Sequence, residues 1–193
     1  MKNSKSLISD LTGRSGQQGF TLIEVMISMV VLTIGMVSLL GVMGLAMTFT
    51  QGSQDLAVSK QLANEALEGI LTARETSNIP WSSIQNTGAG GIFLPGLQVI
   101  YNSGADGIVG TADDAASGQQ TLQLPGPDGI FGTGDDVFLP LSNYKRQIDI
   151  EPVTVNGNTL TNLRSVTITV QYQSPKFKVP QNYILTTFIS PYQ

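Results

Sequence analysis

The feature that most limits what this chain can fold into is an uncharged, largely apolar run of 30 residues, Val25 to Gln54. No Asp, Glu, Lys or Arg interrupts this run. A helix needs about 20 predominantly apolar residues to cross the hydrocarbon core of a bilayer. The run is long enough to do so, and it predicts one membrane-spanning helix.

The residues before this run are polar and mostly basic. Lys2, Lys5 and Arg14 are opposed by Asp10 alone. Positive charge beside a span favours the cytoplasmic side, so we expect the N-terminus in the cytoplasm and the rest of the chain outside it. Glu24 stands at the edge of the run, where burying a carboxylate in lipid costs about 2 kcal/mol or more. Its position indicates a functional role with a cationic partner, an amine.

Two ordinary explanations account for less of this pattern. A secretory signal peptide has an apolar core of about 7–15 residues followed by a cleavage site, whereas here a polar segment precedes a much longer apolar run. A plain signal-anchor helix fits the length. It gives no reason for Glu24 or for the glycine, Gly19, that precedes Phe20.

The order of a basic leader, the hexapeptide Gly-Phe-Thr-Leu-Ile-Glu at residues 19–24 and an apolar helix resembles the N-terminal signature of type IV pilins and type II secretion pseudopilins. The resemblance implies that a prepilin peptidase cuts after Gly19 and methylates the new N-terminal residue, Phe20. It also implies that Glu24 pairs with the N-terminal amine of a neighbouring subunit during assembly.

The same resemblance implies a division of the chain and a location. Residues 1–19 would be the leader peptide, 20–48 the transmembrane and assembly helix, and 49–193 the globular head. The protein would cross the bacterial inner membrane once, with a periplasmic head, and then enter a pilus, a pseudopilus or the cell surface. Its partners would be other pilin or pseudopilin subunits, the prepilin peptidase, the inner membrane and the pilus assembly platform.

Composition narrows what the head can do. The formal net charge is −4, and no cluster of Lys and Arg is present that would bind phosphates, so no nucleic-acid partner is expected. The sequence has no His and no Cys. Disulfides, the usual nucleophile–base pairs and the usual transition-metal sites are therefore excluded. Ser-Lys and paired-carboxylate chemistry stay formally open, but no motif points to either. We expect a protein that is not an enzyme.

Periodicity predicts the elements of the head. Apolar residues at helical spacing continue past the apolar run and predict one helix from about Thr21 to about Glu75, with the head portion ending near residue 76. Alternation of apolar and polar residues then predicts strands. The predicted strands are Leu97–Tyr101, Lys145–Val155, Leu163–Tyr172 and Asn182–Ser190. The dipeptide Asn156-Gly157 predicts a hairpin turn.

A long helix followed by a C-terminal antiparallel sheet, within residues 144–190, is an α+β arrangement. Val166, Ile168, Val170 and Leu185 are the expected inward-facing residues of this sheet. The arrangement also resembles the pilin fold. The last predicted strand is similar to that of PilV-like minor pilins, which favours a minor subunit over a major one.

An internal repeat lies in the glycine-rich and aspartate-rich segment 104–137. The nine residues from Asp106 to Asp114 recur 22 positions later, from Asp128 to Asp136. Each copy begins with Asp-Gly, contains Gly-Thr and ends with two aspartates. Carboxylates brought together repel one another unless a cation lies between them. Oxygen ligands without His or Cys favour calcium.

The repeats resemble calcium-binding aspartate-rich repeats of extracellular proteins, although they lack the EF-hand pattern. The candidate ligands are Asp106, Asp113 and Asp114 for one ion and Asp128, Asp135 and Asp136 for another, unless the two copies share a site. The alternative is a pair of solvated turns, because Asp and Gly are common in turns for backbone reasons alone.

Two classes of function remain open at this point. The first is a structural subunit, a minor pilin or pseudopilin that polymerises through its N-terminal helix. The second is a membrane-anchored, calcium-dependent adhesin or binding module that does not polymerise.

Overall fold

The computed structural model describes residues 19–174 and 179–191, so the leader predicted for residues 1–19 lies outside the described residues except for Gly19. One long α-helix, α1, runs from Leu22 to Glu75. These bounds agree with the predicted helix to within one residue. The chain divides into two compact units that meet between Ala46 and Met47, and each is described by itself.

The first unit, from residue 19 to Ala46, consists of the first half of α1 and the residues just before it. Its large apolar side chains are exposed all round the helix, as expected for a segment whose surroundings are lipid or other helices. An 18-residue window has a mean hydropathy of 2.4, which is apolar enough to cross a membrane. Its hydroxyl groups bond within the helix, since Thr33 donates to the Val30 carbonyl at 2.8 Å and Ser38 to the Ile34 carbonyl at 2.8 Å.

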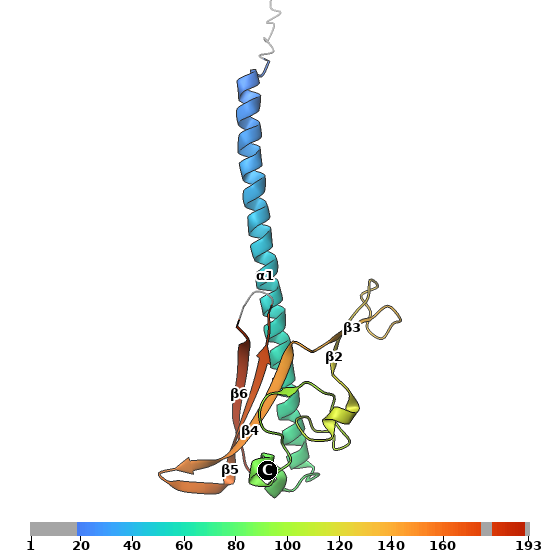
Figure 1. Cartoon of the computed structure of the whole chain (residues 1–193), viewed down its shortest axis with the longest axis vertical. Helices are drawn as coiled ribbons and strands as arrows, with labels where there is room; N and C mark the ends of the chain where they lie inside the picture. The colour runs from blue at the N-terminus through green and yellow to red at the C-terminus, as the bar shows by residue number, and fades with distance from the viewer. Residues whose placement is uncertain (1–18, 175–178, 192–193) are drawn as a thin grey trace, which may run out of the picture. The chain divides into compact units, whose positions relative to one another are not determined.

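The second unit holds a four-stranded antiparallel sheet beside the second half of α1 (Figure 1). Its strands, in spatial order, are β1 (Gln98–Val99), β4 (Tyr144–Val155), β5 (Asn158–Tyr172) and β6 (Gln181–Ile189). The predicted α+β fold is confirmed. Asn156 and Gly157 join β4 to β5 with φ angles of 51° and 80°, as a two-residue type I′ turn requires.

The core lies between the sheet and one face of the second half of α1. The helix contributes the buried residues Leu62, Ala63, Ala66, Ile70 and Ala73. The expected inward residues Val166, Ile168 and Val170 are fully buried on β5, while Leu185 on β6 is half-buried against this core. Helix-to-sheet packing therefore fixes the frame to which the connecting loops are attached.

The connection from α1 to the sheet is held by a tryptophan and an arginine. The Trp81 indole N–H donates to the Thr161 carbonyl at 3.2 Å, and the Arg164 guanidinium lies 4.3 Å from the centre of the Trp81 ring. Arg164 also donates to the carbonyls of Trp81 and Ile84. These contacts pin the residues after the helix to β5.

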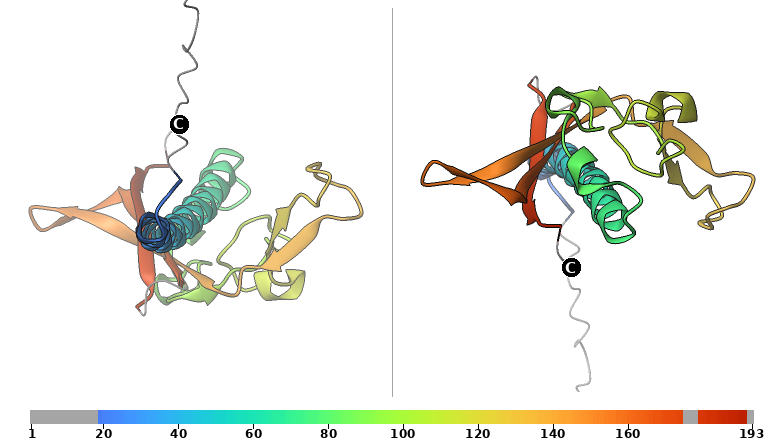
Figure 2. Two further views of the ribbon diagram at one scale, coloured as in Figure 1. Left: turned by 90° about the horizontal axis from the view of Figure 1, so that it is seen from above. Right: turned by 90° about the horizontal axis from the view of Figure 1, so that it is seen from below.

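A separate two-stranded hairpin lies between β1 and β4 in the sequence. It pairs β2 (Thr121–Leu124) with β3 (Val137–Pro140) and was not predicted. Figures 1 and 2 show this hairpin extending away from the four-stranded sheet, with residues 125–136 at its far end. We call the hairpin and its connecting loop the arm.

Candidate functional sites

The hexapeptide at residues 19–24 lies where α1 begins. Gly19 and Phe20 are exposed and precede the helix. Glu24 lies in the first helical turn and is also exposed. A carboxylate there is favoured by the partial positive charge of the helix N-terminus. The predicted cleavage position therefore precedes the helix, and the carboxylate predicted to act in assembly lies in the first turn of the helix.

Thr21 is a residue of this motif to which sequence reasoning gave no role. Its side-chain oxygen accepts a hydrogen bond from the Glu24 N–H at 3.3 Å, which caps the helix. The signal was available in the sequence, because Thr-x-x-Glu is the spacing of a helix capping box. Thr21 therefore fixes the residue at which the helix starts, and with it the position of Glu24.

The two repeats fold into two loops of the same conformation, and the structure lengthens the repeat to 11 residues. We call residues 104–114 the first loop and residues 126–136 the second loop. Their opening residues, Gly104 and Gly126, were not recognised as part of the repeat. A Cβ atom on either glycine would overlap the carboxylate of Asp113 or Asp135, respectively. A larger residue at the start of either loop would force this carboxylate to move.

In the first loop the three aspartates accept hydrogen bonds from the loop itself. Asp106 accepts the Ile108 N–H at 2.8 Å, and Asp113 accepts the Thr111 hydroxyl at 2.7 Å. Asp114 accepts the N–H groups of Gly104 at 2.9 Å and Thr111 at 3.1 Å, and also that of Gly110. The carboxylates close the loop by satisfying its backbone donors.

The second loop repeats these bonds at equivalent positions. Asp128 accepts the Ile130 N–H at 2.8 Å, and Asp135 accepts the Thr133 hydroxyl at 2.6 Å. Asp136 accepts the Gly132 N–H at 2.6 Å. Because the two loops share these bonds, their conformation is set by the repeated sequence and not by its surroundings.

Local hydrogen bonds also set the acidity of equivalent aspartates. The hydroxyl of Thr111 lowers the pKa of Asp113 below 3.8, and the hydroxyl of Thr133 does the same for the pKa of Asp135. Burial tends to raise the pKa of Asp136, but hydrogen bonds from Gln123 and the Gly132 N–H leave that pKa below 3.8. These carboxylates are ionised at neutral pH.

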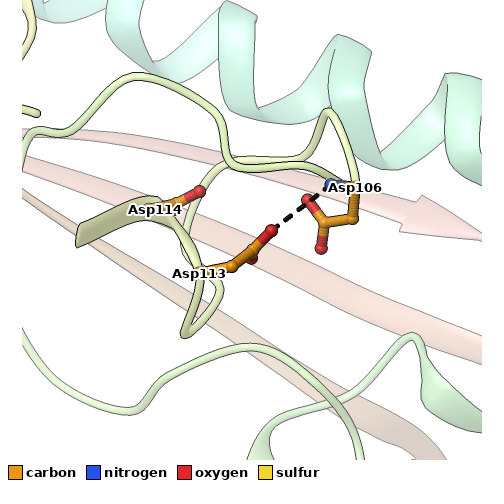
Figure 3. Close-up of side chains that lie close together, drawn as sticks. All are labelled: Asp106, Asp113 and Asp114. Atoms are coloured by element: carbon orange, nitrogen blue, oxygen red, sulfur yellow. Dashed lines mark hydrogen bonds between the residues drawn. The ribbon is translucent and has the colours of Figure 1, made fainter. Parts of the chain in front are cut away.

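The first loop brings its three predicted ligands together. Asp106, Asp113 and Asp114 each offer one carboxylate oxygen, and these oxygens lie within 4.8 Å of one another (Figure 3). Oxygens on one calcium ion lie about 2.4 Å from it, and hence at most about 4.8 Å apart. Within the described ranges, no other trio of acidic residues meets this distance. The three aspartates of the second loop lie in a loop of the same conformation, but their carboxylate oxygens do not all come within 4.8 Å of one another.

The first loop is also bound to the core of the head. Asp114 is 4% exposed, and its carboxylate interacts electrostatically with the buried side chain of Arg146 on β4. Burial lowers the pKa of Arg146, and the charges of Glu65 and Asp114 oppose that shift. Arg146 also donates to the Leu62 carbonyl at 3.1 Å and lies 3.5 Å from Glu65. One buried arginine thus connects the first loop, β4 and α1.

Residues 14–40 match the sequence model of the prokaryotic N-terminal methylation motif. This match covers the predicted processing residues Gly19 and Phe20 and the assembly residue Glu24. No curated protein and no solved structure matches the chain. With one long N-terminal helix followed by an antiparallel sheet, the architecture is pilin-like. The motif is of the type IV pilin kind, and the exposed apolar helix that follows it is consistent with membrane anchoring.

Proposed function

We propose that this chain is a minor type IV pilin or pseudopilin, a structural subunit and not an enzyme. The observation that carries the proposal is the methylation motif at residues 14–40, continuous with an apolar helix that exposes its side chains. A helix of this kind has no partner for its apolar surface within the described residues of its own unit. A membrane first, and then the helices of neighbouring subunits, would cover it.

In this proposal, the residues of the motif act in sequence. A prepilin peptidase cuts after Gly19, and Phe20 becomes the methylated N-terminus. Thr21 caps the helix directly behind the new terminus. The Glu24 carboxylate then neutralises the N-terminal amine of a neighbouring subunit, a pairing that is strengthened because both charges leave water when the helices pack. Glu24 would thereby set the register of assembly.

The topology follows the charge of the leader. The basic N-terminus stays in the cytoplasm, the apolar half of α1 crosses the inner membrane, and the head lies in the periplasm until assembly carries it into a filament. The minor role rests on the resemblance of the last strand to PilV-like proteins. Relative abundance in purified filaments tests that role, because a major subunit would dominate them.

Replacement of Glu24 tests the assembly role. Glu24→Ala should block entry into filaments while leaving cleavage of the leader unchanged, as measured by immunoblots of sheared filaments and membranes. Glu68→Ala is the matched control, because Glu68 is an exposed acid on the same helix. Gly19→Ala should leave the leader attached. Normal filament entry by Glu24→Ala would refute the proposed role of this carboxylate.

The competing function is a membrane-anchored adhesin that does not polymerise. In that case the mature protein would remain in the membrane fraction, and sheared surface filaments would lack it. Glu24→Ala would then change nothing, because an anchor needs only apolar length. Fractionation of wild-type cells therefore separates the two functions before any variant is made.

We also propose that the aspartate loops bind calcium. The convergence of three carboxylate oxygens in the first loop supports this. The lowered pKa of Asp113 supports it too, since ligands must be deprotonated to bind a cation. Each carboxylate has two oxygens with several lone pairs, so bonds to the loop leave acceptors for an ion. Asp106, Asp113 and Asp114 would hold the ion in the first loop, and Asp128, Asp135 and Asp136 an ion in the second.

Thermal unfolding of the full chain in detergent tests the calcium proposal. An ion at about 100 times its dissociation constant stabilises the folded state by about 2.7 kcal/mol, so calcium should raise the melting temperature and a chelator should reverse the change. Asp106→Asn should reduce the shift. Asp149→Asn should retain it, because Asp149 lies on β4 outside the loops, where it accepts hydrogen bonds from Gln147. The same melting temperature with calcium and with chelator would refute the proposal.

A further inference from the structure

The two loops differ in what surrounds their apolar pairs. In the first loop, Ile108 and Val109 are 2% and 3% exposed and belong to the core. In the second loop, the equivalent Ile130 and Phe131 are 59% and 62% exposed. Adjacent large apolar side chains displayed at the end of a projecting hairpin are typical of an interaction surface.

The first loop shows what kind of surface receives this motif. The Leu94 N–H donates to the Gly110 carbonyl at 2.8 Å. Gly110 lies so close to Ile148 that a Cβ atom on it would be 2.7 Å from the Ile148 side chain. Asp114 and Arg146 line the same cavity, together with Gly110 and Ile148, and the charges of Asp114 and Arg146 interact. The receiving surface therefore combines an apolar pocket, a backbone donor and a buried arginine.

The second loop has none of these three partners among the described residues. No atom lies within 4 Å of the place that a Cβ atom on Gly132 would take. Asp136 is bonded to Gln123, which belongs to the arm itself. No charged side chain contributes to the shifted pKa of Asp135 or Asp136, whereas the charge of Asp114 acts on Arg146. The second loop thus has the same conformation as the first loop, but no surface among the described residues buries it.

We propose that the second loop docks on a different protein, into an apolar pocket edged by an arginine or lysine. The partner is expected to have such a pocket because the first loop, which has the same conformation, is buried by a surface of this kind. The partner is not another copy of this chain, since the matching site in each copy is filled by its own first loop. An anionic lipid surface is disfavoured, because three carboxylates lie beside the apolar pair and would be repelled.

Charge complementarity defines the contact further. The loop carries three aspartates and no basic residue, and the strands β2 and β3 carry no charge. A calcium ion bound by the loop would balance two of the three negative charges, so at least one positive charge is left for the partner to supply. Val137 and Phe138 are exposed next to the loop and extend the apolar contact along the arm.

Site-specific photocross-linking of the full chain in the cells that produce it tests this docking. The probe is p-benzoylphenylalanine at position 131, and the control carries it at position 155, which is 50% exposed in the other hairpin, β4–β5. Position 131 should give one discrete adduct with another protein, and position 155 should not. The cross-linked peptide of that protein should come from an apolar surface next to an Arg or Lys.

The charge is tested by combining the position-131 probe with Asp136→Asn. The asparagine keeps an oxygen acceptor for the Gly132 N–H but removes the negative charge. The adduct should fall several-fold, and replacing the basic residue of the partner by Gln should lower it similarly. Circular dichroism of the variant confirms that the head is folded. Adducts with a second copy, with lipid or with nothing would each overturn the proposal, as would an adduct unaffected by both charge changes.

Discussion

The first and second loops are nearly the same sequence in the same conformation, placed in opposite environments. In both, aspartates accept equivalent N–H and hydroxyl donors. One loop is part of the core, and the other stands at the end of the arm. Two influences on a loop, its local hydrogen bonding and its packing against the rest of the protein, can therefore be told apart here. Local hydrogen bonding determines the shape of the loop, and tertiary packing determines what the loop contributes to stability or recognition.

The difference also bears on the proposed calcium sites. In the first loop, the buried Asp114 lies near Arg146, so an ion there would be linked to the core and to global unfolding. In the second loop, an ion would order only the end of the arm. We therefore expect the calcium-dependent change in melting temperature to arise from the first loop.

The largest difference between the loops should appear when equivalent isoleucines are shortened. Ile108→Ala removes buried core atoms and should destabilise the head by about 2–5 kcal/mol. Ile130→Ala removes exposed atoms and should change stability by no more than about 0.5 kcal/mol. Denaturant unfolding of the two variants, compared with the wild type, measures both. Equal losses would mean that the arm is packed against the head in solution.

A smaller difference should follow from the last aspartates of the loops. Asp114→Asn places an amide where a buried carboxylate accepts several N–H groups, and unsatisfied buried donors cost about 1–3 kcal/mol. Asp136→Asn should cost less, because Asp136 is only half-buried and its bonds are to the arm itself, whereas Asp114 is buried in the core. The same unfolding measurement compares the two. A loss at Asp136 as large as that at Asp114 would contradict the contrast in burial.

Much of the fold was accessible from the sequence because its signals are local and periodic. The uncharged run and the helical spacing after it predicted α1 to within one residue, and alternation predicted β4, β5 and β6. Asn156-Gly157 predicted its turn because the backbone there needs positive φ. The arm was missed, since β2 and β3 have four residues each, β2 is followed by Pro125 and Gly126, and β3 ends with Pro140. Strands this short give little alternation to detect.

The sequence also predicted some features of the candidate sites and not others. The repeat itself and its carboxylates were visible, and so was their clustering in the first loop. Gly104 and Gly126 were missed because their role is to leave room for a carboxylate nine residues later, and such contacts have no local signature. Nor could the sequence tell which loop is buried. Ile-Val and Ile-Phe are similarly apolar, and the choice depends on where α1 and β4 place their packing surfaces.

The smallest effect should be the same in both loops, because its cause is local. Thr111→Val and Thr133→Val remove the hydroxyls that lower the pKa values of Asp113 and Asp135, so each pKa should rise toward 3.8, as followed by carboxyl NMR during acid titration. A carboxylate with a lowered folded-state pKa contributes stability above its unfolded pKa and loses it as the pH falls through the folded value. The stability lost in Thr111→Val should therefore be greatest above about pH 4 and should shrink in acid. Thr133→Val should shift its aspartate similarly, yet leave global unfolding unchanged at every pH. If only one aspartate responded, the two loops would not share the local hydrogen bonding that makes them comparable.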